Sequence, residues 1–436
     1  MKDIRIRIAP NAGATALVAL SIAYGVLWVV ARPADEPTAR YIGEICGAEA
    51  LMLFSSSLVL ATFLRPIERA FSGLDRVVAW HRYAATAALL LLVPHVALIT
   101  SAADPYETTF GHGLGDLALL GLLLLVVWAL APSLRGARWP GPVRWLAGIA
   151  YDRWLTAHRL TGLFVAVAVV HGALVSPALH QSTLLRVVYL VVGATGVSAY
   201  AYRELLAKYV FPIYDYTVAE IGRPSENTID VALEPVHMPL AFVPGQFIAL
   251  AFGGAGGWYR HPFSVASAPS ERRLEVTIKA LGDYTTTLQD QLEPGTPAKV
   301  VGPFGGFDYT RGGNDQIWIA GGIGVTPFMS WIRAMDTSFD RTVDFYYSVA
   351  HEADALYLDE IEAAAARHPG FRPQVVNTER EGFLTAERTA NGRRRSSMDV
   401  WVYMCGPPAM AKSLAKGFRR LGVPRSQVRW EQFDTR

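Results

Sequence analysis

HRYAATAALLLLVPH (residues 81–95) and HRLTGLFVAVAVVH (residues 158–171) decide how the first half of the chain folds. Each stretch begins and ends with a histidine, and the residues between are almost wholly apolar. An ionisable side chain inside a membrane span is costly, so it marks a functional site by default. The two pairs, His81 with His95 and His158 with His171, have near-matching spacing. They predict two metal centres stacked across a membrane.

The chain has 436 residues, enough for two or three domains, and its two halves differ in composition. The first two hundred residues are apolar between short charged loops, and the remainder is ordinary globular sequence. The net charge of +2, without a basic stripe, argues against a nucleic-acid partner. Cys46 and Cys405 are too few for a disulfide framework or a cysteine-ligated iron–sulfur cluster. Because no C-x-x-C-H motif occurs, any haem is expected to be held non-covalently.

Six apolar runs approach the roughly 20 residues needed to cross a bilayer. They are Ala14–Val30, Ile45–Leu64, Tyr83–Thr100, Leu114–Ala131, Trp154–Val175 and Val187–Ala201. We read the first as a retained span rather than a signal peptide. Alternate loops are basic, and the segment 101–116 has no basic residue. The positive-inside rule then places both termini in the cytoplasm and the chain in the plasma (inner) membrane as a multi-pass protein.

In this topology His81 and His158 lie near the inner face, and His95 and His171 near the outer face. At 1.5 Å rise per residue, the two histidines of one span are about 20 Å apart. That distance leaves room for one haem above another, each with imidazole on both axial positions. Thirteen residues at about 100° each do not return to one helix face. The fifth span is therefore expected to contain a kink or π-bulge, or to use different rotamers. Interfacial or hydrogen-bonded histidines are the alternative.

An arginine follows each inner histidine. Arg82 and Arg159 are placed to pair with haem propionates, because a guanidinium binds a carboxylate through two parallel bonds. Simple anchoring at the cytoplasmic face explains them equally well.

Beyond about residue 211 the pattern changes to short strands. Thr217–Leu233, Gln246–Phe252 and Leu274–Lys279 predict a small antiparallel barrel. From Gln316 onward strands and helices alternate, with Ala353–Arg367 as a helix, which predicts a doubly wound parallel sheet. A glycine-rich turn at 321–327 follows its first strand. Such a turn lets backbone approach a pyrophosphate at a helix N-terminus, although it often serves packing only.

Five motifs in order make the pattern specific. They are Pro244-Gly245-Gln246-Phe247, His261-Pro262-Phe263-Ser264-x-x-Ser267, Gly302-Pro303-x-Gly305, Gly321-Gly322-x-Gly324-x-Thr326-Pro327 and Cys405-Gly406-Pro407. Their order resembles the ferredoxin–NADP reductase module. Joined to six spans with paired histidines, it resembles the NADPH oxidase/ferric reductase superfamily, and its compact bacterial members in particular. The resemblance implies a six-helix transmembrane bundle (1–210), an FAD-binding β-barrel (211–311) and an α/β NAD(P)-binding domain (312–436).

The resemblance also implies roles for single residues. Phe263 would flank the isoalloxazine and Ser264 would bond near its N5. The flavin diphosphate or ribityl chain would be contacted by His261, Lys279, Gly282 and Thr285. The coenzyme's pyrophosphate would be held by Gly321, Gly322, Gly324 and Thr326. Cys405 and the pair Gly406-Pro407 would lie beside the nicotinamide, and Phe433 would cover the flavin, although three residues follow it. Cys405 as a buried core residue and Phe433 as a core strand residue are the alternatives.

These expectations describe a transmembrane oxidoreductase. Electrons would pass from cytosolic NAD(P)H through FAD and two haem b groups to an acceptor on the outer face. Oxygen, giving superoxide, is the leading acceptor, and ferric chelate, a quinone or a periplasmic protein are the alternatives. A haem redox carrier or membrane anchor, with the flavin module serving a soluble partner, is the alternative class. The resemblance favours NADPH slightly over NADH. Beyond membrane lipid no obligatory partner is expected, and activity is expected to be independent of calcium.

Overall fold

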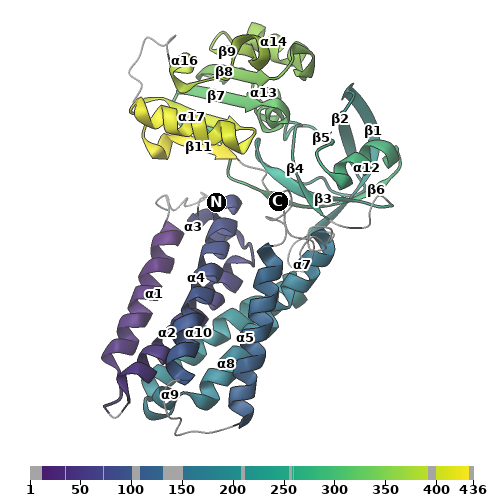
Figure 1. Cartoon of the computed structure of the whole chain (residues 1–436). Helices are drawn as coiled ribbons and strands as arrows, with labels where there is room; N and C mark the ends of the chain where they lie inside the picture. Colours follow the sequence, from purple (N-terminus) through teal and green to yellow (C-terminus); the bar gives the residue numbers. More distant parts are fainter. Residues whose placement is uncertain are drawn as a thin grey trace. The chain divides into compact units, whose positions relative to one another are not determined.

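The computed structural model describes residues 12–34, 36–71, 73–100, 109–130, 151–207, 212–254, 258, 260–390 and 399–431. The chain forms two compact units that divide between residues 210 and 211. The first is helical, and the second contains both sheets (Figure 1).

The first unit consists of helices that follow the apolar runs of the sequence. The longer ones are α1 (Ala12–Val30), α2 (Thr38–Leu60), α4 (Leu74–Thr100), α5 (Thr109–Leu130), α8 (Thr161–Val175) and α10 (Thr183–Ala201). Shorter helices are α3 (Arg65–Phe71), α7 (Tyr151–Arg159) and α9 (Pro177–Gln181), and a π-helical turn (Tyr202–Leu206) follows α10.

Among the described residues, five helical stretches are long and apolar enough to cross a membrane, and they coincide with five of the six predicted spans. They are Ala12–Val30, Thr38–Leu60, Arg76–Ile99, Leu155–Val175 and Thr183–Leu206. The stretch Thr109–Leu125, in the predicted fourth span, is apolar but shorter.

Glycines let these helices approach closely. In α10, a Cβ atom on Gly196 would lie 2.6 Å from the Ser55 hydroxyl of α2. A Cβ on Gly193 would lie 2.7 Å from the Val169 side chain of α8. Small residues at such contacts are typical of helix packing in membranes, where close van der Waals contact replaces hydrophobic burial. α10 therefore packs against both helices, and the buried Leu51, Val165 and Leu185 belong to one apolar core.

The helical run from residue 151 to 175 is broken between its two histidines. α7 ends at Arg159, and α8 begins at Thr161. At the break the Leu160 amide bonds the Ala157 carbonyl, a tighter i to i−3 step, and the Thr161 hydroxyl donates to the His158 carbonyl at 2.5 Å. The break occurs where the thirteen-residue spacing requires a change of helix face.

The second unit begins with a six-stranded antiparallel sheet in the order β4-β3-β6-β1-β2-β5. Its strands are β1 (Ile213–Ser225), β2 (Thr228–Pro235), β3 (Phe247–Phe252), β4 (His261–Ser264), β5 (Leu274–Lys279) and β6 (Pro297–Phe304), with helix α12 (Asp283–Gln291) between the last two. The stretch Thr217–Leu233, predicted to contain strands broken by turns, covers most of β1 and β2, because a turn at Glu226-Asn227 reverses the chain. Val231, Ile248 and Val300 are among the residues of its buried core.

A five-stranded parallel sheet follows, in the order β11-β10-β7-β8-β9, and confirms the predicted doubly wound domain. Its strands are β7 (Asp315–Gly321), β8 (Thr342–Val349), β9 (Phe371–Asn377), β10 (Trp401–Cys405) and β11 (Val428–Glu431). Helices α13 (Thr326–Arg333), α14 (Leu358–Arg367), α15 (Thr378–Glu381), α16 (Ala386–Ala390) and α17 (Pro408–Arg420) connect them. Strand order reverses between β7 and β10, so the loops after these two strands meet at the switch point.

One predicted element starts in the wrong place. The helix expected over Ala353–Arg367 is a short 3₁₀ turn at Glu352–Asp354 followed by α14 from Leu358. Tyr357, at the N-cap, has a left-handed backbone (φ 61°), which separates the two.

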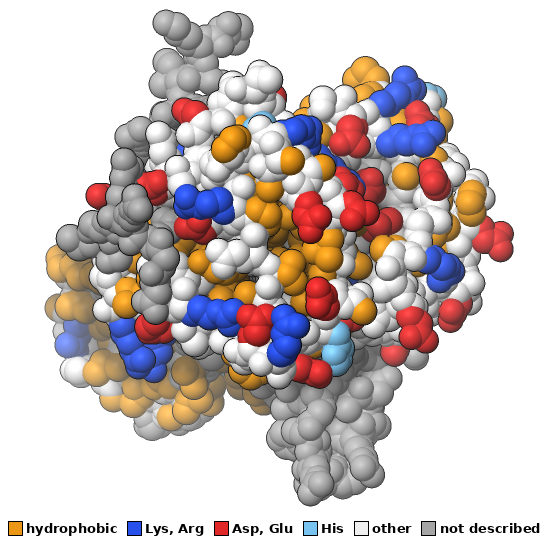
Figure 2. Space-filling model, turned by 90° about the horizontal axis from the view of Figure 1, so that it is seen from above, with side chains coloured by type: hydrophobic (Ala, Val, Ile, Leu, Met, Phe, Trp, Pro, Cys, Tyr) orange, Lys and Arg blue, Asp and Glu red, His pale blue; other side chains and the backbone are white. Residues whose placement is uncertain are grey.

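On the face seen in Figure 2, acidic and basic side chains lie interspersed, as expected for 40 Lys and Arg against 38 Asp and Glu.

Candidate redox sites

The helical unit brings the four histidines together in two pairs. His81 of α4 faces His158 of α7, with ring centroids 6.2 Å apart and ring planes at 89°. His95, also in α4, faces His171 of α8 at 6.5 Å and 82°. The pairing is the one that the topology predicts, and along α4 the two pairs are separated by about 20 Å.

Hydrogen bonds fix the protonation of three rings. The Nδ1 atom of His81 lies 2.9 Å from the Ser57 carbonyl, and that of His95 lies 2.9 Å from the Gly43 carbonyl. His171 Nδ1 lies 2.8 Å from the Gly111 carbonyl. Because a carbonyl can only accept, each Nδ1 carries the proton and donates it. Each neutral ring then keeps a lone pair on Nε2, which is the arrangement that metal-ligating histidines usually have.

The spacing of the rings suits a metal between them. Two metal–imidazole bonds of about 2.0 Å, plus roughly 1.1 Å from each nitrogen to its ring centre, span about 6.2 Å. Within the described residues, no group of three or more His, Cys, Asp or Glu side chains could hold a metal ion. A haem iron takes only two ligands from the protein, so the two pairs fit this group.

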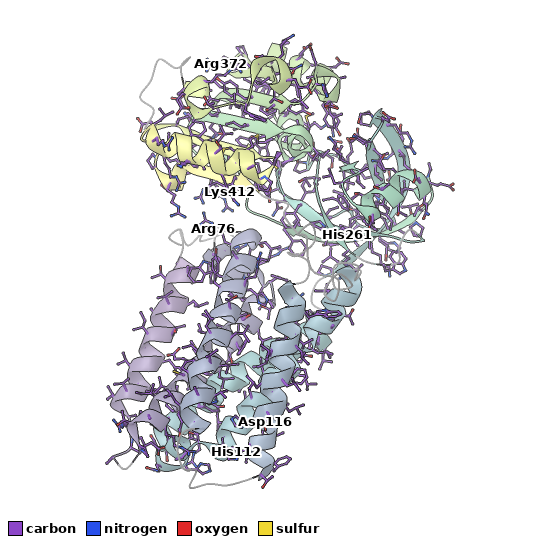
Figure 3. The ribbon with its side chains drawn as sticks, in the orientation of Figure 1. Arg76, His112, Asp116, His261, Arg372 and Lys412 are labelled. Atoms are coloured by element: carbon purple, nitrogen blue, oxygen red, sulfur yellow. The ribbon has the colours of Figure 1, made fainter. Side chains whose placement is uncertain are left out.

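Glycines next to the outer pair make room for the rings, a feature that the sequence analysis missed. A Cβ on Gly47 of α2 would lie 2.7 Å from His95 Nδ1. A Cβ on Gly115 of α5 would lie 2.6 Å from His171 Cε1. His112 and Asp116 lie with Gly115 in the first two turns of α5 (Figure 3).

The arginines predicted to meet propionates differ in their surroundings. Arg82 is exposed. Arg159 forms an ion pair with Glu204 through two donors: its Nε donates to the two carboxylate oxygens at 3.1 and 2.9 Å, and its Nη2 donates to Oε2. A propionate would have to compete with Glu204 for Arg159.

In the second unit, the His-Pro-Phe-Ser motif forms β4 and pairs with β3 (Figure 3 labels His261). Ser264 is buried opposite Phe247, whereas Pro262 and Phe263 are half-buried, and Phe263 packs partly on the barrel core. A half-exposed aromatic ring beside a buried hydroxyl suits a planar flavin ring. Ser267, completely buried, accepts a hydrogen bond from the Glu275 amide at 3.1 Å, so its hydroxyl is engaged within the protein.

The residues predicted to hold the rest of FAD gather at the start of α12. Thr285 Oγ1 accepts from the amides of Leu281 and Gly282 at 2.9 and 3.1 Å, which shapes the turn. The His261 ring stacks on Tyr284 of α12 at 3.8 Å. Lys279 ends β5 just before this turn. A cation and an α-helix N-terminus are both suited to a diphosphate.

The glycine turn after β7 meets the loop after β10 at the switch point. A Cβ on Gly324 would lie 2.3 Å from the Cys405 carbonyl, so this glycine is required for packing. Gly322 has φ 53° and open space around its missing side chain, which leaves backbone available to a ligand. Thr326 donates to the Ile323 carbonyl at 2.8 Å and stabilises the turn. Pro327 follows at the start of α13.

Cys405 is fully buried at the end of β10, before Gly406-Pro407. Burial, and after it the charge of Glu431, raises the pKa of this thiol well above its ordinary value. The sequence analysis did not identify Glu431 as a neighbour of Cys405. Glu431 ends β11, so it is distant from Cys405 in the sequence and close only in the fold. Its carboxylate lies 3.1 Å from where a Cβ of Gly305 would be. Phe433 lies outside the described residues.

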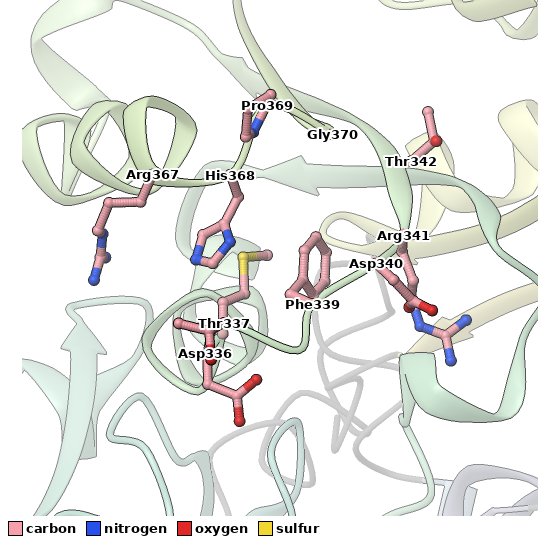
Figure 4. A pocket seen from close by; sticks show the side chains of 11 residues that line it. Asp336, Thr337, Phe339, Asp340, Arg341, Thr342, Arg367, His368, Pro369 and Gly370 are labelled. Atoms are coloured by element: carbon pink, nitrogen blue, oxygen red, sulfur yellow. The ribbon is translucent and has the colours of Figure 1, made fainter.

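A pocket of about 680 Å³ lies at the edge of the parallel sheet where β8 and β9 begin, opposite the edge where the glycine turn follows β7 (Figure 4). Phe339, Arg341 and His368 line it. Ligands of doubly wound sheets bind at the carboxyl ends of the strands, so this pocket is separate from the coenzyme site.

Comparison with known proteins identifies the second unit. Residues 213–316 match the family model of an FAD-binding domain, and residues 318–416 that of an oxidoreductase NAD-binding domain. The reductase subunit of an aromatic O-demethylase from Amycolatopsis is 31% identical over 236 residues, which are 50% of this chain and 68% of that protein. The second half of the chain belongs to the ferredoxin–NADP reductase family.

Other relatives of this reductase module serve different systems. The electron transfer component of toluate 1,2-dioxygenase from Pseudomonas putida is 24% identical, over 50% of this chain and 67% of that protein. A flavohemoprotein from Burkholderia is 27% identical, over 50% of this chain and 58% of its own length. A crystal structure of the Amycolatopsis cytochrome P450 reductase GcoB superposes with a TM-score of 0.45 at 25% identity, over 51% of this chain and 70% of that one. Both matched family models lie in the second half of the chain.

Proposed function

We propose that the chain is a transmembrane oxidoreductase of the NADPH oxidase/ferric reductase superfamily. It carries electrons from cytosolic NAD(P)H, by way of FAD and two bis-histidine haems, to an acceptor on the outer face of the plasma membrane. Both termini lie in the cytoplasm, and the domains are 1–210, 211–311 and 312–436. The observation that carries the proposal is the double histidine pairing, in one chain with a ferredoxin–NADP reductase module.

The histidine pairs have what axial ligands of a haem need. In three of the four rings a backbone carbonyl holds the Nδ1 proton, which leaves Nε2 free to bind iron. A hydrogen bond to a fixed carbonyl also orients each ring. Because the two rings of each pair come from different helices, the packing of those helices would hold a haem iron in place.

When bound, FAD accepts two electrons together and releases them singly, and haem iron carries one at a time. The chain's own residues bind and orient these groups. The turn at Leu281–Thr285 and the half-exposed Phe263 would hold the flavin. Gly322 presents backbone to the coenzyme's pyrophosphate, and Cys405, protonated because its pKa is raised, stays a neutral neighbour of the nicotinamide.

Oxygen is the proposed acceptor, with superoxide as the product. If His95 and His171 both bound the iron of the outer haem, they would leave it no open position, which favours a small acceptor that needs no iron ligation. Ferric chelate is the second candidate for the same reason. Purified protein loaded with FAD and haem is given NADPH or NADH in air with cytochrome c, with and without superoxide dismutase. Oxygen as acceptor predicts that dismutase abolishes cytochrome c reduction. Turnover with ferric chelate under argon, and little superoxide in air, would assign a ferric reductase instead.

A different class of function keeps the helices as an anchor or haem carrier while the flavin module serves a soluble partner or a quinone. The relatives that are reductase components of oxygenases favour testing this class. The His171→Ala variant separates the two. Reduction of every acceptor after loss of the outer haem would contradict the transmembrane route. Activity without added calcium is expected, and a strict calcium requirement would contradict that part of the proposal.

A further inference from the structure

The two domains of the reductase module are joined by polar side chains of α13. Ser330, completely buried, donates its hydroxyl proton to the Ser267 carbonyl at 2.7 Å. One turn later, Arg333 Nη1 donates to the Ala266 carbonyl at 3.3 Å. α13 starts at the glycine turn of the predicted coenzyme site, and Ala266 and Ser267 form the end of the motif that begins at His261 in the predicted flavin site. One helix therefore connects the two sites.

Arg333 also joins carboxylates from both domains. Its Nη1 lies 2.9 Å from Glu275 of β5, in the barrel. Its Nε and Nη2 donate to the two oxygens of Glu360 in α14, each at 2.8 Å. The side chain is only 14% exposed. A planar guanidinium can satisfy two carboxylates at once in a fixed geometry, which a lysine ammonium cannot reproduce.

Tyr357 makes the second connection. Its hydroxyl donates to Asp230 Oδ1 of β2 at 2.5 Å and lies 2.5 Å from the Thr277 hydroxyl of β5. Its backbone is left-handed, with φ 61°, which is uncommon for a residue with a side chain. The Arg333 guanidinium lies over the Tyr357 ring at 5.3 Å. These contacts with Asp230, Thr277 and Arg333 thus hold Tyr357 in an unfavourable backbone conformation at the point where α14 meets the barrel.

We propose that Arg333 and Tyr357 are positioning residues for hydride transfer. They hold α13 and α14 against the barrel and so fix the distance between the nicotinamide and the flavin, each of which is bound by a different domain. Reacting atoms must approach to about 3–3.5 Å, and a displacement of about 1 Å can cost 100-fold in rate. The inference rests on the reductase activity proposed above, and it adds two residues that lie outside the sequence motifs predicted to hold the coenzyme and the flavin.

A purely structural role predicts something different. A salt bridge or hydrogen bond that only stabilises the fold changes thermal stability and leaves hydride transfer unchanged in the protein that remains folded. Two controls have this character. Arg372 of β9 donates to Asp344 of β8 at 2.7 Å, inside the nucleotide-binding domain (Figure 3 labels Arg372). The Tyr346 hydroxyl donates to the Thr389 carbonyl at 3.3 Å, in the same domain.

The test uses the full-length protein with the variants Arg333→Lys and Tyr357→Phe, and the controls Arg372→Lys and Tyr346→Phe. Flavin reduction by NADH and by NADPH is followed by stopped flow under argon, together with FAD content and coenzyme affinity. Hydrogen–deuterium exchange is measured in peptides that cover 261–267 and 326–333.

We expect the Arg333 and Tyr357 variants to reduce flavin about tenfold more slowly or worse, with FAD content and coenzyme affinity within about twofold of wild type. Exchange in both peptides rises in these variants and not in the controls. A rate within about twofold of wild type, or equal loss in the controls, overturns the proposal. A wild-type flavin that neither coenzyme reduces contradicts the proposed function itself, and the exchange comparison alone then decides whether the two residues hold the domains.

Discussion

The rings of His81 and His158 lie at right angles with their centroids 6.2 Å apart, although the two residues come from different helices. His95 and His171 repeat this relationship at 6.5 Å. The two pairs thus share one geometry, which is the arrangement that the two proposed haem sites require.

Replacing one outer histidine should remove one haem and leave the other. In His95→Ala we expect haem b per FAD to fall by about half, because iron loses one of its two protein ligands. Flavin reduction by NAD(P)H should be unchanged. Haem and FAD are measured by the pyridine haemochromogen assay and by flavin release. His180→Ala is the control. His180 lies in α9, and its Nδ1 bonds the Ser176 carbonyl at the start of the same helix, so this ring belongs to neither histidine pair. Unchanged haem in His95→Ala would show that this pair is not a haem site.

Two glycines in α5 offer a matched pair of variants. Gly115→Ala would place a Cβ 2.6 Å from His171 Cε1, whereas Gly113→Ala would place one in open space. We expect Gly115→Ala to lose the outer haem. Gly113→Ala should keep both haems and stabilise its helix by about 0.5–1 kcal/mol, because alanine is the better helix former. Absorption spectra and thermal melts distinguish these outcomes, and equal haem content in the two variants would refute the steric argument.

Coenzyme choice should depend on the loops after β8 and β9. There His351 Nδ1 lies 3.2 Å from the Glu379 carboxylate, where the adenosine ribose reaches in doubly wound folds. Glu379→Arg replaces a repulsive charge by one that binds a 2′-phosphate. The ratio of kcat/KM for NADPH to that for NADH should rise about tenfold, equivalent to about 1.4 kcal/mol. Glu362→Arg, an exposed position on α14, is the control. The same ratio in both variants would place the adenosine elsewhere.

Cys405 should resist alkylation in the folded protein. Its raised pKa means that the neutral thiol persists where a free cysteine, with a pKa of about 8.5, is half ionised. In a Cys46→Ser background, iodoacetamide labelling at pH 8.5 should be about 100-fold slower than in guanidinium chloride, since the thiolate is the nucleophile. Mass spectrometry measures both rates. Labelling of the folded protein as fast as the unfolded one would mean that Cys405 is exposed and ionised.

Much of this arrangement could be predicted because it repeats along the chain. Apolar runs mark the helices, and the spacing of the four histidines predicts which of them pair. The same spacing anticipates the break that the structure has at Leu160. The parallel direction of the strands in the second sheet follows from the alternation of strands and helices.

The contacts between distant segments could not be predicted in the same way. Nothing in the sequence around Gly43 or Gly115 indicates that a histidine of another helix lies against it. The ion pair of Arg159 with Glu204 also depends on how two helices pack. α14 begins later than its helical pattern suggests, because contacts with the barrel hold Tyr357 in a left-handed conformation.

The most direct test of the account is the haem content of the purified full-length protein and its response to coenzyme. Haem b and FAD are quantified, NADPH or NADH is added under argon, and the haem absorption bands are followed. The account predicts two haem b groups per FAD, with spectra of bis-histidine iron, and reduction of both by the coenzyme. Protein that retains FAD but binds no haem, or haem that stays oxidised while the flavin is reduced, would contradict electron transfer through the histidine pairs.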